Sequence, residues 1–580
     1  MPPSIIPPIT PAEFLQYLQR CIPPSGWSNK IATANSGGPD SVALLFLLNA
    51  VIAARQRTTQ SVPVKRRPPG IPPPPHGLPE HVLSVHINHS LQDAASNMER
   101  VATAMARRYK VPFHTERVPW GEHPFPPRGE VDEKVAREVR YNMLFTAMDK
   151  LQTDVIAFAH HADDQVETAI MRMSQGSGSR GLAAMRPVRR WGMGKKDNEY
   201  FAFGADGMRK WIVRPLLHVS KDRLLATCEA NKLEYIHDPT NFQPDLTFRN
   251  RIRQTLLLKD QPPLVKPEAA EPSPEASSDI EPYIARLRAE VPDVHPSWQL
   301  HEAVRLYGIR LEETDSRVTN ALARARLPSP PSTLLLKSDE LAEVKDEEDR
   351  IALIRRCLRY VSHGPWGAVW AEASGGRESL RRVSEELWPS TPRTPLAEMP
   401  IDPLHGTHVD PRKTFAAGGG VLATPVAIKL EDGLVRYRGR KLDDDDEVDG
   451  WIFSRAPPYR KSARPDEQVT IDVTDGILAA RNAGRKTYRV LYDYRFDITF
   501  QATGIWPKAV EEHVMRKGRI VIEPDTKWVL PKVMMRAGVR GPQCIGKFLW
   551  NLPGWAGSQR RPVKYQSIMN MRFVRSLDAI

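Results

Sequence analysis

The fold of this chain is decided by the stretch Asn35-Ser36-Gly37-Gly38-Pro39-Asp40-Ser41, which follows a short apolar run, Ile31-Ala32, and precedes a longer one, Val42–Leu48. This order predicts a strand, a glycine turn with hydroxyl groups, and a helix. Such a turn directs backbone N–H groups and the positive end of a helix toward an anion. Glycines let the backbone approach a phosphate closely. The stretch therefore predicts a phosphate-binding loop, and the alternative is a turn that only caps a helix.

The residues of this loop form the first group of candidate binding residues: Ser36, Gly37, Gly38, Pro39, Asp40 and Ser41. No lysine follows the glycines, so the motif is not the Walker type of phosphate loop. The carboxylate of Asp40 stands where a Mg²⁺ ion could bridge it to a phosphate.

Length and composition limit the class of protein. The 580 residues suggest three or four domains, and the net charge of +13 favours a polyanionic partner, although charge can also serve solubility alone. No apolar run approaches the length of a membrane span. The cysteines show no metal-binding spacing, which is typical of a reducing compartment. They are Cys21, Cys228, Cys357 and Cys544.

Strand and helix patterns alternate from Pro11 to about Leu217. This alternation predicts an α/β fold, a doubly wound parallel sheet with helices on both faces and its ligand at the carboxyl ends of the strands. The expected strands are Lys30–Ala34, His81–Ile87, Val111–His114 and Asp154–Ala159. The expected helices are Ser41–Ala54, Gln92–Arg108, Val131–Leu151 and Asp163–Ser174.

The chain divides into six predicted segments. A nucleotide-binding domain would span residues 1–217, with an exposed proline-rich insertion at 56–78. It is followed by an extension at 218–260, a flexible linker at 261–279, a helical domain at 280–400, an irregular and partly acidic linker at 401–467, and a small mixed α/β domain at 468–580.

A second group of chemically active side chains lies in His160-His161-Ala162-Asp163-Asp164-Gln165-Val166-Glu167-Thr168, directly after an expected buried strand. Asp164 and Glu167 share one face of a helix. Asp40 and Asp164, from two separate strands, are what a Mg²⁺–triphosphate complex requires. His160 could contact a phosphate or be a neutral buried histidine. The simpler reading of the acidic residues is favourable charge in the first turn of a helix.

The loop resembles that of the N-type ATP pyrophosphatases, and several further segments resemble one branch, tRNA(Ile)-lysidine synthetase. The segments occur in the order expected for that family. Besides the histidine-rich group they are Val85–Leu91, Ala136–Tyr141, Gly176–Gly178, Gly181–Met185, Arg214–Leu217, His237–Asn241 and Arg249–Arg253.

The resemblance implies a ligase that uses ATP and Mg²⁺. The C2 oxygen of the wobble cytidine in a CAU-anticodon tRNA(Ile) would attack the α-phosphorus of ATP, and free L-lysine would then displace AMP to form lysidine. By resemblance, Asp40 and Asp164 hold Mg²⁺, and Glu167 binds or deprotonates the lysine amine. Arg140 and one of Arg249 or Arg253 would neutralise charge on the phosphates. The alternatives are a solvated helix face for Arg140 and a basic helix end for the other two.

A basic segment follows these motifs and suits contacts with RNA phosphates and unpaired bases, although a solvated basic loop would look the same. Its cations and aromatic residues are Arg186, Arg189, Arg190, Lys195, Lys196, Arg209, Lys210, Trp191 and Trp211.

The sequence leaves two alternative functions and two cellular locations undecided. The chain could be a tRNA thiolase of the same superfamily, although those enzymes usually need paired cysteines. It could also be a catalytically inactive RNA-binding protein. The proline-rich insertion favours a eukaryotic, fungal-like organellar member, hence a mitochondrial location, with the cytoplasm as the alternative; Met1–Pro24 gives little support for import.

Overall fold

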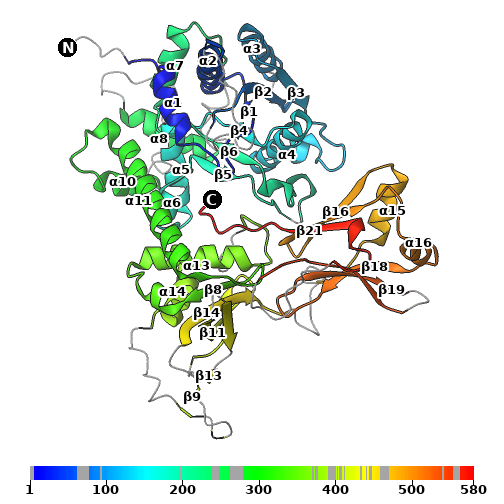
Figure 1. Ribbon diagram of the computed structural model, residues 1–580. Helices are drawn as coiled ribbons and strands as arrows, with labels where there is room; N and C mark the ends of the chain where they lie inside the picture. Colours follow the sequence, from blue (N-terminus) through cyan, green and yellow to red (C-terminus); the bar gives the residue numbers. More distant parts are fainter. Residues whose placement is uncertain are drawn as a thin grey trace.

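Figure 1 shows the computed structural model of the chain, with an N-terminal α/β domain joined by long helices to a strand-rich C-terminal half. The structure describes residues 6–61, 77–91, 94–195, 197–237, 247–260, 279–368, 371, 376–389, 400–401, 403, 408–409, 412–431, 434–438, 441–442, 447–457, 469–537, 541–552 and 562–580.

The N-terminal domain is built on a six-stranded sheet of order β3-β2-β1-β4-β6-β5. All neighbouring strands pair in parallel except β5, which is antiparallel to β6 at one edge. The strands are β1 (Lys30–Ala34), β2 (His81–Asn88), β3 (Phe113–Arg117), β4 (Val155–Ala157), β5 (Val188–Arg190) and β6 (Trp211–Val213). Because the chain proceeds outward from β1 in both directions, the sheet is doubly wound, as the sequence predicts, and its switch point lies between β1 and β4.

Helices cover both faces of this sheet. Ile31 packs into one core with α1, α2, α3 and α7, and Ala32 packs into the opposite core with α4. The alternation follows from the two-residue period of a strand. The helices are α1 (Pro11–Gln19), α2 (Pro39–Ser61), α3 (Ala95–Arg108), α4 (Glu133–Leu151), α5 (Ala162–Ser174), α6 (Ser179–Leu182), α7 (Lys221–Ala230) and α8 (Phe248–Asp260).

One boundary of the predicted proline-rich insertion is wrong. Helix α2 continues through Ser61, so the first residues of the segment 56–78 are helical rather than an exposed loop. The first proline in this segment is Pro63, and no residue between 56 and 62 interrupts a helix. Residues 62–76 lie outside the described part of the chain.

A helical region follows and is joined to a second sheet. Its helices are α10 (Glu281–Ala289), α11 (Pro296–Ala325), α12 (Ser338–Ala342), α13 (Glu347–Val361) and α14 (Arg377–Leu387). Helix α11 packs against α5 and α6 of the N-terminal domain and against α13, so it connects the two halves (Figure 1).

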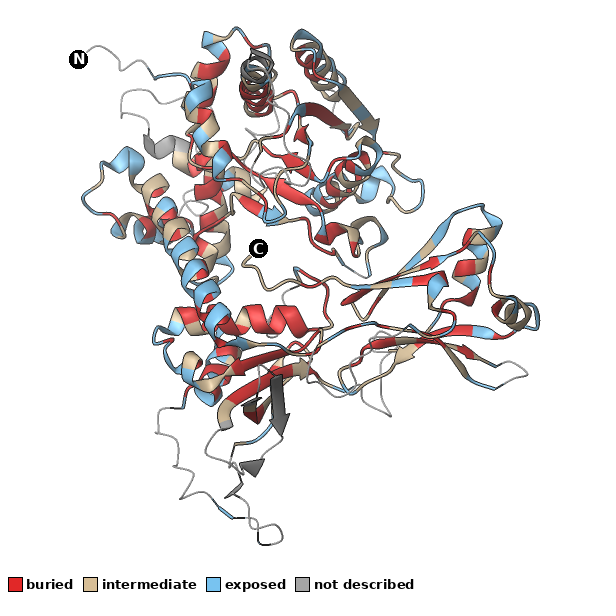
Figure 2. Ribbon diagram, viewed as in Figure 1, coloured by how far each residue is buried: buried red, intermediate tan, exposed pale blue. Residues whose placement is uncertain are grey.

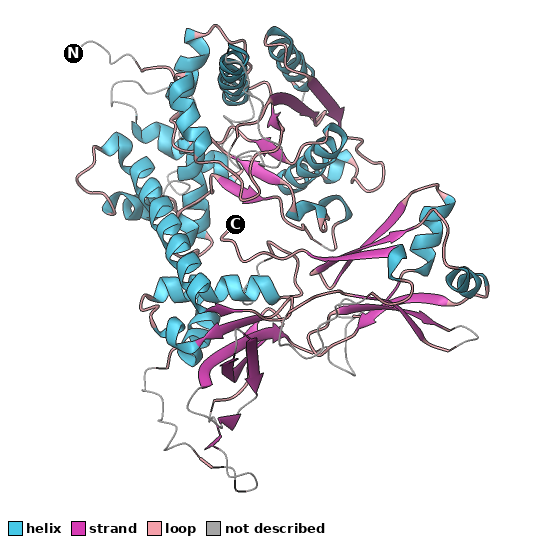
Figure 3. Cartoon of the chain, in the orientation of Figure 1, coloured by secondary structure: helices cyan, strands magenta, loops and turns pink. Residues whose placement is uncertain are grey.

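Where the structure describes the segment 401–467, it consists largely of strands rather than the irregular linker that the sequence suggested. The second sheet has the order β10-β11-β14-β8-β7, with β12 paired to β11. Figure 3 shows strands in this part of the molecule beside the helical region. Its strands, with the separate pair β9 and β13, are β7 (Arg326–Leu327), β8 (Leu334–Lys337), β9 (His408–Val409), β10 (Phe415–Gly418), β11 (Val421–Glu431), β12 (Leu434–Arg438), β13 (Lys441–Leu442) and β14 (Glu447–Arg455). Pairing with distant β8 buries Ile452 and Phe453, a contact that local sequence does not reveal.

The C-terminal domain is mixed α/β, as expected. Two sheets of order β15-β18-β19-β20 and β16-β17-β21 enclose one apolar core (Figure 2). The elements are β15 (Ile471–Asp472), α15 (Thr474–Asn482), β16 (Thr487–Tyr492), β17 (Phe496–Gln501), α16 (Lys508–Met515), β18 (Arg519–Pro524), β19 (Pro531–Arg536), β20 (Gln543–Lys547) and β21 (Met569–Phe573). Among the described residues, no helix combines the length and hydropathy of a membrane span.

Candidate active site

The loop between β1 and α2 is held in shape by Asn35, a buried residue that the sequence reasoning did not count as part of the site. Its Oδ1 accepts hydrogen bonds from the Gly37 N–H at 3.0 Å and the Ser41 hydroxyl at 3.2 Å. Its Nδ2 donates to the Ser84 hydroxyl at 3.1 Å. The Ser36 N–H donates to the Ser41 hydroxyl at 3.1 Å. The loop is therefore organised before any anion binds. The sequence feature that could have indicated the role of Asn35 is an amide side chain at the end of a strand.

Gly37 is required by the shape of this loop. Its φ is +81°, and a Cβ at this position would lie 2.6 Å from the backbone oxygen of Met98. Its carbonyl accepts a hydrogen bond from the Ile236 N–H at 3.0 Å. A side chain here would carry both the cost of left-handed backbone and a steric clash.

The two carboxylates expected to share a metal ion converge on one imidazole. Asp40 lies in the first turn of α2 after β1, and Asp164 lies in the first turn of α5 after β4, the neighbouring strand. The Nε2 atom of His161 lies 3.8 Å from Asp40 Oδ2 and 3.5 Å from Asp164 Oδ2. Lys221, which sequence reasoning missed, places its Nζ 2.6 and 2.7 Å from the two oxygens of Asp40. Adjacent parallel strands thus bring together two groups that are far apart in sequence.

The charges around His161 set its protonation. Burial alone lowers the pKa of His161, but the carboxylates of Asp164, Asp163 and Asp40 outweigh burial and raise it to about 9. Burial would raise the pKa of Asp164, but the positive charges of His161 and Arg249 dominate and hold that pKa well below its usual range. The site is therefore an ordered cluster of carboxylates and cations at neutral pH.

Glu167, Arg249 and Arg253 form a second ion cluster beside the first. Arg249 donates to Glu167 Oε2 at 2.5 Å and to Asp164 Oδ1 at 2.7 Å. Arg253 donates to the two oxygens of Glu167 at 2.7 and 3.1 Å. Glu167 is buried, with 2% of its surface exposed, and both of its oxygens are engaged by arginine. In this state Glu167 holds the two guanidinium groups in place.

A cavity of about 530 Å³ opens in front of the loop. Its lining includes Ser36, Asp40, Arg140, Asp164 and Arg249, whereas Glu167 and Arg253, which contact Arg249 and Glu167 respectively, do not line the cavity. Arg140 is exposed and lines the cavity, so its guanidinium group can face a ligand bound there.

His160 also lines this cavity, as a neutral base. Burial and the nearby charge of Arg214 hold the pKa of His160 well below its usual value. Its Nδ1 accepts a hydrogen bond from Arg214 at 3.3 Å. A neutral ring in the lining of the cavity is compatible with both sequence readings of His160, the neutral histidine and the phosphate contact.

The cavity suits a magnesium-bound triphosphate. It lies at a glycine turn and a helix N-terminus, and its lining holds three carboxylates and three arginines, among them Asp40, Asp164 and Arg140. These groups match the donor and acceptor pattern of a magnesium-bound triphosphate. Within the described residues, no three His, Cys, Asp or Glu side chains form a complete metal site.

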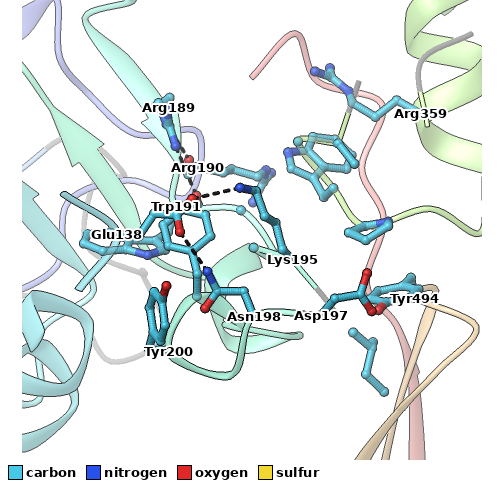
Figure 4. A pocket seen from close by; sticks show the side chains of 18 of the residues that line it. Glu138, Arg189, Arg190, Trp191, Lys195, Asp197, Asn198, Tyr200, Arg359 and Tyr494 are labelled. Carbon is cyan, nitrogen blue, oxygen red and sulfur yellow. Dashed lines mark hydrogen bonds and ion pairs between the residues drawn. The ribbon is translucent and has the colours of Figure 1, made fainter. Parts of the chain in front are cut away.

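A second cavity, of about 1300 Å³, lies between the N-terminal domain and the C-terminal half (Figure 4). Arg189, Arg190 and Lys195 line it together with Arg359 from α13. Lys195 and Asn198 both donate to Glu138 of α4, at 2.8 and 2.7 Å. The remaining cationic residues of its wall are Lys134, Arg180 and Arg186.

The structure corrects part of the predicted RNA-binding segment. Trp191 and Trp211 are 3% and 1% exposed and belong to the cores of the sheet, so they cannot stack on a base. Lys210 is buried and lies 2.8 Å from Asp149. Arg190 lies over the ring of Trp211 at 4.3 Å and pairs with Asp578. An alternating apolar and basic pattern can be a strand edge as well as an RNA surface, which is why the sequence did not separate the two.

The comparisons with known proteins agree with this geometry. Residues 12–259 match the family model described as a PP-loop domain. The N-terminal domain of this chain is therefore a PP-loop domain, and the candidate site lies at its phosphate loop.

The relatives indicate which kind of PP-loop protein the chain is similar to. It is 31% identical over 255 residues to the tRNA(Ile)-lysidine synthase of Bacillus subtilis, covering 43% of this chain and 45% of that protein. It is 34% identical over 266 residues to the tRNA(Ile)-lysidine synthase of a Bradyrhizobium species, covering 46% and 59%. The chain thus matches about half the length of these relatives. It is also 29% identical over 505 residues to the enzyme of the same name from Pseudomonas aeruginosa, covering 82% and 96%.

One solved structure, a U34-tRNA thiolase NcsA from Methanococcus maripaludis with its [4Fe-4S] cluster, matches at 15% identity with a TM-score of 0.30. It covers 52% of this chain and 79% of that chain. This likeness is too low to bear on function.

Proposed function

We propose that this chain is a tRNA(Ile)-lysidine synthetase, a ligase that forms a C–N bond between the wobble cytidine of a CAU-anticodon tRNA(Ile) and free L-lysine at the expense of ATP. The observation that carries the proposal is the approach of Asp40 and Asp164 to one imidazole, beside a phosphate loop and an open cavity. Similarity to lysidine synthases along most of the chain supports it.

The chemistry requires activation because the C2 carbonyl of a pyrimidine is a poor electrophile. In the first step the cytidine C2 oxygen bonds to the α-phosphorus of ATP, and pyrophosphate leaves. In the second step the amine of lysine bonds to C2, the C2–O bond breaks, and AMP leaves with that oxygen. Bound Mg²⁺, held by Asp40 and Asp164, would neutralise negative charge on the phosphates.

The protein supplies position and charge in the first step. The backbone N–H groups of the loop hold the leaving pyrophosphate, as a helix N-terminus does for anions. Arg140 is exposed at the cavity, and Arg249 reaches its wall. Guanidinium groups there stabilise the charge that develops at phosphorus.

Glu167 has a role in the second step. Its oxygens are held by Arg249 and Arg253. When phosphates attract these guanidinium groups, Glu167 is released to bind the lysine ammonium or to accept its proton. Under this proposal, Glu167→Ala retains part of pyrophosphate release but loses lysine transfer. Equal loss of both steps would remove this role.

The cavity between the two halves is the proposed site of the RNA backbone. It carries Lys134, Arg189 and Lys195 on one wall and Arg359 on the other. It shares α4 with the nucleotide cavity, since Arg140 lines one and Lys134 the other.

The experiment that tests the proposal uses the full chain with a CAU-anticodon tRNA transcript, ATP, Mg²⁺ and lysine. We expect mass spectrometry of the wobble nucleoside to show the mass of lysidine. Omission of lysine should leave pyrophosphate release but no lysidine. Sulfur at the wobble base would indicate a thiolase, and tRNA binding without pyrophosphate release would indicate an inactive RNA-binding protein. Either outcome contradicts the proposal.

The cysteines argue for the ligase rather than the thiolase. Burial raises the pKa of Cys21 to about 12 and that of Cys228 to about 12. Such thiols carry almost no thiolate at neutral pH and are poor carriers of sulfur.

A mitochondrial location is the companion hypothesis, because lysidine would serve an organelle that decodes AUA. Its motivation is the proline-rich insertion at 56–78. Imaging of the tagged full chain against a mitochondrial marker tests it, and a purely nuclear or cytoplasmic signal would contradict it.

A further inference from the structure

His301 stands outside the PP-loop domain but contacts the network that holds the metal-binding carboxylates. It belongs to α11, whose apolar side packs on α5 through a core that includes Val166, Ile170 and Leu300. The Nε2 atom of His301 lies 3.4 Å from Asp163 Oδ1, with the His301 side chain 24% exposed. Helix α11 therefore places a polar side chain at the start of the helix that carries Asp164.

Asp163 passes this contact on to His161. The other oxygen of Asp163 accepts a hydrogen bond from the Lys221 N–H at 2.9 Å and lies 3.2 Å from His161 Nδ1. This arrangement makes Nδ1 the donor toward Asp163 and directs Nε2 toward the oxygens of Asp40 and Asp164. Carboxylate–histidine contacts of this kind fix the orientation of a ring whose other nitrogen faces a metal site.

The chemistry of His301 favours a polar role over simple packing. Its Nδ1 is buried and has no hydrogen-bond partner among the described residues. A buried unpaired nitrogen is costly, and an apolar side chain would fill the same space without that cost. The contact between its Nε2 atom and Asp163 is the polar interaction that this position provides.

We infer that His301 is a positioning residue for nucleotide activation: through Asp163 and His161 it fixes the carboxylates of Asp40 and Asp164, and so makes the affinity for Mg·ATP depend on how α11 is seated. The inference rests on the proposed function, because it assigns those carboxylates to magnesium. It joins the helical region to the chemistry of the PP-loop domain.

The test compares three variants of the full chain, His301→Ala, His301→Gln and Glu313→Gln. Glutamine keeps an N–H donor that can reach Asp163, and Glu313 is an exposed residue of the same helix. Calorimetry measures binding of a non-hydrolysable ATP analogue while the Mg²⁺ concentration is varied. We expect His301→Ala to raise the half-saturating Mg²⁺ concentration about tenfold, the usual effect of losing such an outer contact. The other two variants should stay within about twofold of the wild type, well short of that effect.

The pathway itself is tested with Asp163→Asn. If His301 acts through Asp163, the double variant His301→Ala/Asp163→Asn should bind Mg·ATP no more weakly than Asp163→Asn alone. Additive losses would overturn the inference. So would a folded His301→Ala variant with unchanged Mg²⁺ dependence, or a glutamine variant as weak as the alanine variant.

Failure of the inference is distinguishable from failure of the proposed function. If the wild type does not bind Mg·ATP at all, the assignment of Asp40 and Asp164 is wrong. If the wild type binds and His301→Ala binds equally well, only the role of His301 is removed.

Discussion

At the scale of single residues, the site depends on a few groups whose positions leave little freedom. Asp40 is the clearest case, since it faces the cavity, pairs with Lys221 and lies 3.8 Å from His161. Gly37 is the second, because its backbone conformation and its contact with Met98 leave no room for a side chain.

We predict that Asp40→Asn lowers the rate of tRNA-dependent pyrophosphate release by about 100-fold or more, because the variant removes a charge that holds the metal and phosphates in the transition state. The control is Asp222→Asn, an exposed residue in the first turn of α7. A rate within a few-fold of wild type would show that Asp40 does not hold the metal.

We predict that Gly37→Ala lowers the free energy of unfolding of the N-terminal domain by about 2 kcal/mol and weakens ATP binding, because the new Cβ meets the Met98 carbonyl. Gly121→Ala is the matched control, with a φ of +83° and open space around its Cβ. It carries the backbone strain alone, so urea denaturation of the two variants separates strain from clash. An equal loss of stability in Gly37→Ala and Gly121→Ala would show that the clash with Met98 contributes nothing.

The pH dependence of stability reports on His161. Its folded pKa of about 9 exceeds its ordinary value of 6.5, so the folded state binds this proton more tightly than the unfolded state. The stabilisation is fully present below pH 6.5 and is lost as the pH rises through 9. It amounts to about 3 kcal/mol at most. We predict that raising the pH from 6.5 to 9 lowers the urea midpoint of the wild type by more than that of His161→Gln. Equal decreases in the two midpoints would contradict this prediction.

At the scale of elements, α11 joins the two halves of the chain through polar contacts. Asp315 on this helix lies 2.5 Å from Arg186 of the PP-loop domain and 3.1 Å from Arg356 of α13. The three charges are largely buried, so each depends on the others for compensation.

We predict that Asp315→Ala destabilises the fold by about 3 to 5 kcal/mol, because it leaves two buried guanidinium groups without their carboxylate. Limited proteolysis should then cut between the PP-loop domain and the helical region faster than in the wild type. Glu313→Ala, on the exposed face of the same helix, serves as the control. An unchanged digestion rate would show that apolar packing alone seats α11.

At the scale of the whole molecule, part of the positive charge gathers around the cavity between the two halves of the chain. The chain carries a net charge of +13, and cations from both halves line the cavity of about 1300 Å³ between them. A surface of this kind binds phosphates with release of counterions.

We predict that Arg189→Ala and Lys134→Ala weaken tRNA binding and each lower the slope of log K against log salt by about 0.7 to 0.9. Arg100→Ala is the control, because Arg100 lies on α3 away from this cavity and pairs with Glu234. Fluorescence anisotropy with labelled tRNA over a salt series gives both quantities. If Arg100→Ala lowers the salt slope as much as Arg189→Ala does, the result argues against a specific RNA site.

The sequence by itself determined the doubly wound sheet, the phosphate loop and the two acidic groups, because these depend on local order: strand, turn, helix, with charges at the helix N-termini. The loop at Ser36–Ser41 and the strand Lys30–Ala34 lie where the pattern placed them. Only the tertiary structure decided that Lys221 and His161 lie beside Asp40 and that Glu167 is held by two arginines. It also decided that Trp191 and Trp211 are core, and that β10, β11, β12 and β14 share a sheet with β8. These are contacts between residues far apart in the chain, and no local pattern encodes which distant partner a charge or a strand will find.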